Sequence, residues 1–148
     1  MKNSRKIVLS VLLIAVILAS VFAFASCGKK YVQQTDTAVG ITVDASVMSN
    51  VEGKTLKDYM DALVEKKELT YSGKDSQYGI MLDTINNLKA DATKGEYWLI
   101  YSNDDEYSNE SWGTYEFMGT TYKSATLGVS SLPIKMGKTY VFMISKAQ

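Results

Sequence analysis

Residues 55–67 read TLKDYMDALVEKK, and they contain the clearest helical pattern in the chain. Thr55 followed by Asp58 three residues later is a capping-box pair, which marks the start of a helix. Apolar residues then recur at helical spacing on one side of the segment: Leu56, Tyr59, Met60, Leu63 and Val64. Lysine and acidic residues occupy the other side. The segment therefore predicts one amphipathic helix whose apolar stripe lies on a sheet.

Strand patterns lie on both sides of this helix. Residues 41–47 alternate apolar and polar side chains, which is typical of a strand with one buried face. The sequences YGIMLDTI, YWLIY, GTYEFMGTTY and TYVFMI begin at residues 78, 97, 113 and 139, and the third suggests a hairpin that turns near Gly119. YWLIY and TYVFMI are apolar on both faces, which suits central strands. These elements predict an α+β domain with one helix packed across a mixed sheet of four or five strands.

The first 26 residues have the layout of a secretory signal. Three basic residues within the first six precede an uncharged apolar run, residues 7–25. This run is also about long enough to cross a bilayer as a helix, so an uncleaved anchor is the alternative. Ala25 and Ser26 lead directly into Cys27, the single cysteine of the chain, and this arrangement resembles the lipobox of bacterial lipoproteins.

The lipobox resemblance implies cleavage before Cys27 and lipidation of its thiol. A single cysteine also excludes an internal disulfide, so packing alone has to stabilise the domain. Attached lipid chains hold a protein stably on a membrane. We therefore expect residues 1–26 to be a signal peptide, 27–39 a lipidated tether and 40–148 the folded domain. The protein would be lipid-anchored at the cell membrane and face its extracytoplasmic side.

Composition excludes several functions. Removing residues 1–26 reduces the 16 basic side chains to 13, against 16 acidic ones, and a net negative charge opposes binding to nucleic acid. The chain has no histidine, and its cysteine is assigned to lipid, so the commonest general base and the cysteine-based nucleophiles and zinc sites are missing. No glycine-rich phosphate loop follows a strand. We expect a protein that is not an enzyme and has no cofactor.

Two features surround the polar loop that follows YWLIY. The acidic stretch NDDE at residues 103–106 offers oxygen ligands for calcium, but it lacks the spacing of an EF-hand loop and suits a solvated loop, so we expect no metal. Aromatic residues also gather there: Tyr97, Trp98, Tyr101, Tyr107, Trp112, Tyr115 and Tyr122. Packing explains those within strands. Trp112 and Tyr115, which flank Gly113 beside the loop, are less easily explained by packing, and aromatic residues at a loop rim, Trp112 above all, are candidate ligand or partner contacts.

Four segments follow one another along the chain: TLKDYMDAL, YGIMLDTINNL, GEYWLIYSND and SATLGVSSLPIKMGKTYVFMI. Their order resembles a family of domains of unknown function in exported bacterial proteins, which is related to the C-terminal domain of transcobalamin and intrinsic factor. The resemblance covers about residues 40–146. It implies a β-grasp fold of the soluble-ligand-binding kind, with residues 102–124 as an insertion relative to shorter members.

The same resemblance implies a ligand. In transcobalamin-type carriers this domain closes over one side of a cobalamin and a helical-barrel domain supplies the other side, so a partner protein would complete the site here. The ligand contacts implied by position are Tyr78, Met81, Trp98, Thr126, Leu127 and Gly128. We therefore expect a surface-anchored domain that binds a small ligand, with a corrinoid as the candidate. The alternative is a protein- or cell-wall-interaction module that uses residues 102–122 as its contact surface.

Overall fold

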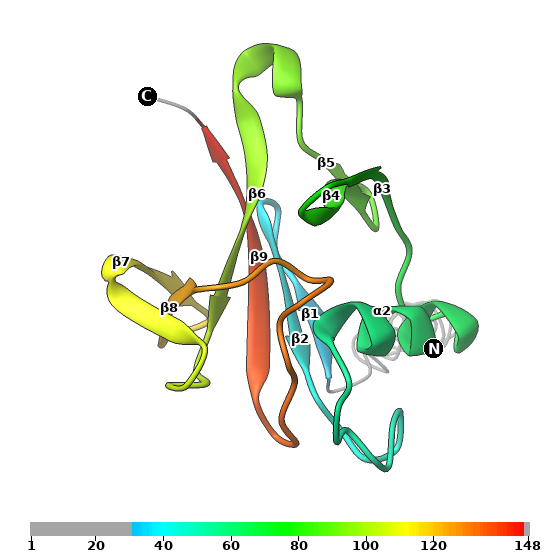
Figure 1. Ribbon diagram of the computed structural model, residues 1–148. Coiled ribbons are helices and arrows are strands. Elements are labelled where there is room, and N and C mark those ends of the chain that lie inside the picture. Colours follow the sequence, from blue (N-terminus) through cyan, green and yellow to red (C-terminus); the bar gives the residue numbers. More distant parts are fainter. Residues whose placement is uncertain (1–30, 147–148) are drawn as a thin grey trace, which may run out of the picture.

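The structure, a computed structural model, describes residues 31–146 (Figure 1). Its helical elements are the α-helix α2 (Leu56–Glu65) and the short 3₁₀-helix η2 (Ala92–Lys94). Its strands are β1 (Val32–Gln34), β2 (Ala38–Thr42), β3 (Tyr71–Ser76), β4 (Gly79–Ile85), β5 (Leu88–Lys89), β6 (Glu96–Ser102), β7 (Ser108–Phe117), β8 (Thr120–Ala125) and β9 (Thr139–Lys146).

The strands form two antiparallel sheets, a six-stranded sheet in the order β1-β2-β9-β6-β8-β7 and a three-stranded sheet in the order β3-β4-β5. The predicted fold class, an α+β β-grasp with one helix on a single mixed sheet, is therefore wrong. The strand patterns do not specify pairing partners, and the segment after the helix pairs with its own neighbours instead of joining the larger sheet. The central positions predicted for YWLIY and TYVFMI are confirmed, because they form the inner strands β6 and β9.

Helix α2 begins as predicted. The Thr55 side chain accepts the backbone N–H of Asp58, and the Asp58 carboxylate accepts the backbone N–H of Thr55 at 2.8 Å, which completes the capping box. Leu56, Tyr59, Met60 and Leu63 are fully buried, whereas Val64 is 39% exposed, so the buried stripe is narrower than predicted. Backbone bonds from Leu56 to Leu132 and from Lys57 to Val129 fix the helix start against the chain that follows β8.

The capping box predicts a specific pH dependence. The Thr55 backbone N–H, the largest cause, lowers the pKa of the Asp58 carboxyl below its ordinary value of 3.8. A carboxyl whose folded pKa is depressed stabilises the fold above the unfolded pKa, and this contribution is lost as the pH falls through the folded value. Asp58→Asn should therefore cost about 0.5–1 kcal/mol at neutral pH and almost nothing near pH 2. Denaturant unfolding at the two pH values measures this, with the exposed Asp75→Asn as control. An undiminished cost in acid would contradict it.

The six-stranded sheet has apolar residues on both faces. One face packs against α2 and the small sheet, and its core includes Val39, Ile41, Tyr140 and Phe142. The other face carries a second core of Ala38, Tyr101, Phe117, Tyr122 and Val141, which the β7–β8 hairpin covers by folding back over the sheet. A side chain at Gly40 would meet the Phe117 ring at 2.5 Å, so glycine is required for this packing.

The N-terminal part of the described chain belongs to the large sheet. Residues 31–39, placed in the predicted tether, include β1 and the start of β2, which pairs with β9. Strand β2 ends at Thr42, earlier than the alternation of residues 41–47 predicted, because Asp44 starts a turn by accepting the N–H of Ser46. The predicted signal peptide and Cys27 lie outside the described residues. Among residues 31–146, no helix has the length and apolarity needed to cross a membrane.

Candidate functional site

A groove lies between the two sheets, where β4 stands beside the upper part of β6 in Figure 1. Its volume is about 390 Å³, which falls in the range of roughly 300–1,000 Å³ that is usual for small-molecule sites. The lining residues are Ile80, Met81 and Leu82 of β4, Tyr97, Trp98 and Ile100 of β6, and Gly128 and Val129 of the segment after β8. None of them is charged, so the groove suits an uncharged, apolar group.

Two hydrogen bonds hold the walls of the groove together. The indole Nε1–H of Trp98 donates to the backbone carbonyl of Asp83 at 3.1 Å, which joins β6 to β4. The backbone N–H of Ile80 donates to Ser130 Oγ at 3.0 Å, which joins β4 to the segment after β8. Gly79 permits this second contact, because a side chain there would lie 2.7 Å from the Ser130 Cβ and because its φ is +100°. These two hydrogen bonds therefore set the distance between the walls of the groove.

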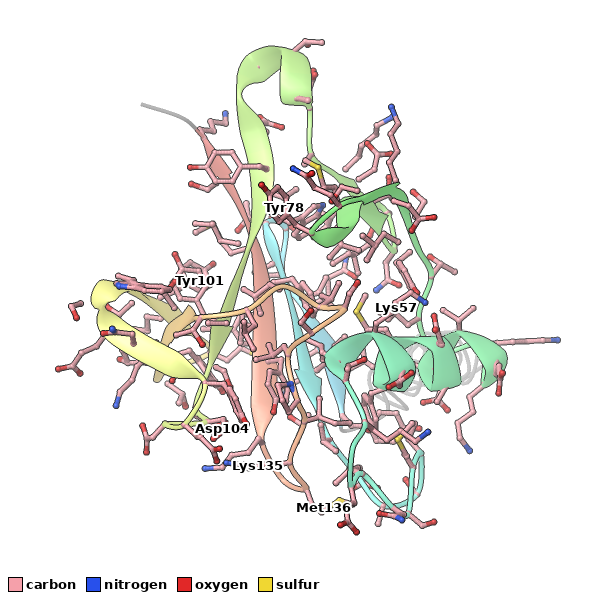
Figure 2. All side chains as sticks on the ribbon, viewed as in Figure 1. Lys57, Tyr78, Tyr101, Asp104, Lys135 and Met136 are labelled. Atoms are coloured by element: carbon pink, nitrogen blue, oxygen red, sulfur yellow. The ribbon has the colours of Figure 1, made fainter. Side chains whose placement is uncertain are left out.

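Large apolar side chains are exposed along the groove. Met81 is 67% exposed and Tyr97 is 46% exposed, and both line the groove. Tyr78, at the turn of the β3–β4 hairpin (Figure 2), is 84% exposed, and Leu127, beside the lining residue Gly128, is 40% exposed. Such a concentration of exposed apolar groups around a hollow is typical of a binding surface.

The structure brings together three of the residues implied by the resemblance, since Met81, Trp98 and Gly128 line the same groove. Tyr78, Thr126 and Leu127 are not lining residues, although they lie on the segments that form it. The Thr126 hydroxyl and N–H both donate to the backbone carbonyl of Tyr107, so Thr126 fixes its loop in place. Trp112 lies elsewhere, on the edge strand β7, where the pairing with β8 shifts register between Asn109 and Thr114.

Sequence reasoning did not select five of the lining residues: Ile80, Leu82, Tyr97, Ile100 and Val129. A signal for two of them was present in YWLIY, because a strand that is apolar on both faces can expose one face to a ligand. No sequence pattern indicated that β4 would face β6 instead of pairing with it.

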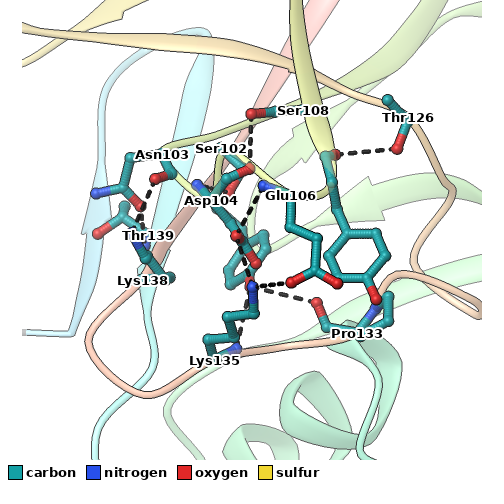
Figure 3. A network of polar contacts seen from close by, with 12 residues as sticks. Ser102, Asn103, Asp104, Glu106, Ser108, Thr126, Pro133, Lys135, Lys138 and Thr139 are labelled. Atoms are coloured by element: carbon teal, nitrogen blue, oxygen red, sulfur yellow. Dashed lines mark hydrogen bonds and ion pairs between the residues drawn. The ribbon is translucent and has the colours of Figure 1, made fainter.

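The predicted acidic loop is largely a structural network (Figure 3). Asp104 is buried, and its Oδ1 binds the Lys135 ammonium at 3.1 Å and accepts the backbone N–H of Glu106. The Glu106 carboxylate binds the same ammonium at 2.5 Å. These contacts, first Glu106 and then Asp104, raise the pKa of Lys135, and Lys135 lowers the pKa of Glu106. Throughout residues 31–146, no three metal-ligating side chains are grouped to hold an ion.

Neighbouring groups show similar structural roles. Burial raises the pKa of Tyr140 to about 12, and its hydroxyl donates to the carbonyl of Pro133 while accepting the N–H of Lys135. A second hollow, between α2 and β3, contains Asp61, but that carboxylate already binds the hydroxyl of Tyr71 and the ammonium of Lys57. Most polar groups of both regions are therefore used for folding, although Asp104 Oδ2 is buried without a hydrogen-bond partner among residues 31–146, and the apolar groove is the best candidate site.

The central part of the chain has a recognisable relative. Residues 53–116 match a domain of unknown function, DUF4430. The DUF4430 match runs from the approach to α2 through the small sheet and β6 into β7, so it includes both strand walls of the groove but not Gly128 or Val129. No curated protein matches the chain.

Proposed function

We propose that the domain is a non-enzymatic binding domain that takes a ligand into the groove between β4 and β6. The observation that carries this proposal is the uncharged hollow of about 390 Å³ with exposed Met81 and Tyr97 at its margins. An apolar ligand would gain about 25 cal/mol for each Å² of apolar surface removed from water, with stacking on Trp98 in addition. Apart from the Tyr97 hydroxyl, the described lining residues of the groove offer no side-chain acid, base or nucleophile that would act on such a ligand.

A corrinoid is the specific ligand that the resemblance to the transcobalamin C-terminal domain supports. The groove would contact one side of so large a molecule, and a partner protein would cover the other. The test titrates the full-length protein, purified in detergent, with cobalamin and with cobinamide while recording corrin absorbance and tryptophan fluorescence. A saturable change in corrin absorbance that is lost in Trp98→Phe supports the proposal. No response up to about 1 mM, where binding is worth only about 4 kcal/mol, would exclude corrinoids.

We propose in addition that the protein is a lipoprotein on the extracytoplasmic side of the cell membrane. The support is the sequence Ala25-Ser26-Cys27 after an uncharged apolar run. Wild type should incorporate a fatty-acid probe and remain in the membrane fraction, whereas Cys27→Ala should lose the label because lipidation needs the thiol. Metabolic labelling followed by fractionation measures both properties. Equal labelling of the two proteins would contradict the proposal.

The second candidate function is a protein- or cell-wall-interaction module. It is favoured by the edge strand β7, on which Trp112 is 64% exposed at the register shift. Cosedimentation with purified cell-wall sacculi tests this candidate, with Trp112→Ala compared with Trp98→Phe. Loss of cosedimentation in Trp112→Ala alone would favour β7 as the contact surface. Loss in Trp98→Phe alone would favour the groove.

A further inference from the structure

The groove meets its two strands at their edges. Consecutive residues of a strand point to opposite faces of a sheet, so a hollow on one face contacts every second residue. The groove instead contacts three consecutive residues of β4, Ile80, Met81 and Leu82, and the neighbours Tyr97 and Trp98 of β6. Because the groove contacts residues from both faces of each strand, it runs along the strand edges. The backbone N–H and C=O groups of a strand point outward at these edges.

The edge of β6 is open beside the groove. Strand β9 pairs with β6 along its whole length, whereas β8 pairs only with Tyr101 and Ser102 before the chain leaves the sheet. The backbone N–H of Glu96 donates to the backbone carbonyl of Asp91, so it points away from β9. Along a strand, the N–H and C=O groups of successive residues point alternately to the two sides. The backbone N–H and C=O groups of Trp98 and Ile100 therefore face the open side. No other described strand pairs with them there.

The facing edge of β4 is open as well. Strand β3 pairs with one side of β4, and on the other side β5 pairs only with Thr84 and Ile85. The N–H of Ile80 points away from β3, because it donates to Ser130 Oγ. By the same alternation, the backbone groups of Leu82 point to the open side. Two strand edges that lack a partner among the described strands, at Trp98 and Ile100 of β6 and at Leu82 of β4, thus flank one apolar hollow.

We propose that this groove, beside the corrinoid that the resemblance supports, also binds an extended stretch of polypeptide that pairs with the open edge of β6 in the row that β8 vacates. This inference rests on the groove being a binding site, as proposed above, and names polypeptide as a second ligand class for it. Backbone hydrogen bonds would hold the segment, and apolar side chains at alternate positions would fill the hollow. The segment is an uncharged internal part of a longer chain, because no charged lining residue could neutralise a free amino or carboxyl terminus. The open edge from Tyr97 to Ile100 fits about four residues.

The test uses the blocked tetrapeptide acetyl-Val-Thr-Val-Thr-amide. It is titrated into the full-length protein carrying Trp112→Phe, so that Trp98 is the remaining tryptophan and reports on the groove. Two matched controls carry N-methyl groups at residues 1 and 3 or at residues 2 and 4, which keeps the side chains and removes one set of backbone donors. Strand pairing predicts saturable binding of the parent peptide and at least about tenfold weaker binding of one or both N-methylated forms.

A substitution in the protein provides an independent check. A Cβ added at Gly128 would meet no atom within 4 Å, so Gly128→Phe places a ring beside the groove with no clash at its point of attachment. It should abolish peptide binding with unchanged thermal unfolding, whereas Ser131→Phe, which adds the same ring at an exposed residue outside the lining, should leave binding unchanged. Equal binding of the parent peptide and both N-methylated forms would overturn the inference.

Small aromatic molecules separate this inference from the proposed function. Binding of indole or p-cresol, but not of the parent peptide up to about 1 mM, would overturn the peptide assignment and leave the groove as an apolar ligand site. If neither class bound, the peptide inference would be wrong, and if the corrinoid titration were flat as well, the proposed function of the groove would also be wrong. The expected result is peptide binding with competition by the aromatic molecules.

Discussion

Leu63→Ala is expected to destabilise the domain by about 2–5 kcal/mol. Leu63 is fully buried in the core that joins α2 to the large sheet, together with Phe142 and Ile85. Removing three of its side-chain carbons loses buried apolar surface and leaves a cavity that the surrounding strands fill only in part. Chemical denaturation of the purified protein measures the loss as a difference in the free energy of unfolding.

Two controls on the same helix show whether burial is the cause. Val64 is adjacent and apolar but 39% exposed, so Val64→Ala should cost well under half as much. Lys57 forms an exposed ion pair with Asp61 at 2.8 Å, and Lys57→Ala should stay within about 0.5 kcal/mol. If all three variants were equally destabilised, the assignment of the buried face of α2 would be incorrect.

Asp104→Ala is expected to cost about 2 kcal/mol, because it removes charge-assisted hydrogen bonds to Lys135 and to the N–H of Glu106. The cost stays below that of a fully buried ion pair, since the Lys135 side chain is 42% exposed and water can solvate it after the change. Thermal and denaturant unfolding measure the loss, and the loop between β6 and β7 should become more accessible to proteases.

Asp105→Ala is the matched control, one residue further along the same loop. The Asp105 side chain is 78% exposed, and its pair with Lys123 lies on the surface, so its removal should change stability far less than Asp104→Ala does. Equal losses in the two variants would show that the network around Lys135 does not hold the loop. A larger loss in Asp105→Ala would reverse the assignment.

Local structure was the part of the fold that could be predicted from the sequence. The capping box of Thr55 and Asp58 and the inner strands β6 and β9 follow from patterns within a few residues. Sheet membership could not be predicted, because pairing depends on contacts between distant segments. The separation of β3, β4 and β5 into their own sheet is one such case, and the return of the β7–β8 hairpin over the second face is another.

The candidate site was predicted in part for the same reason. Met81, Trp98 and Gly128 were placed by the order of segments, and they meet in the groove because β4 faces β6 there. The role of Asp104 was missed, since NDDE has the composition of a solvated loop and burial of one carboxylate depends on Lys135, which lies 31 residues away. Trp112 was selected for its position beside Gly113 and a polar loop, and the structure places it on β7, at the far edge of the sheet.

The pairing of β2 with β9 has a consequence for how the chain folds. The hydroxyls of Thr42 and Thr139, which lie 97 residues apart, are hydrogen bonded across this pair. Loop-closure entropy has to be overcome before such distant contacts form, so sheets of this kind fold slowly. A ribosome-bound chain that still lacks β9 cannot complete the large sheet or its core. The domain therefore reaches its native state only after synthesis has passed β9, and until then chaperones can bind the incomplete chain.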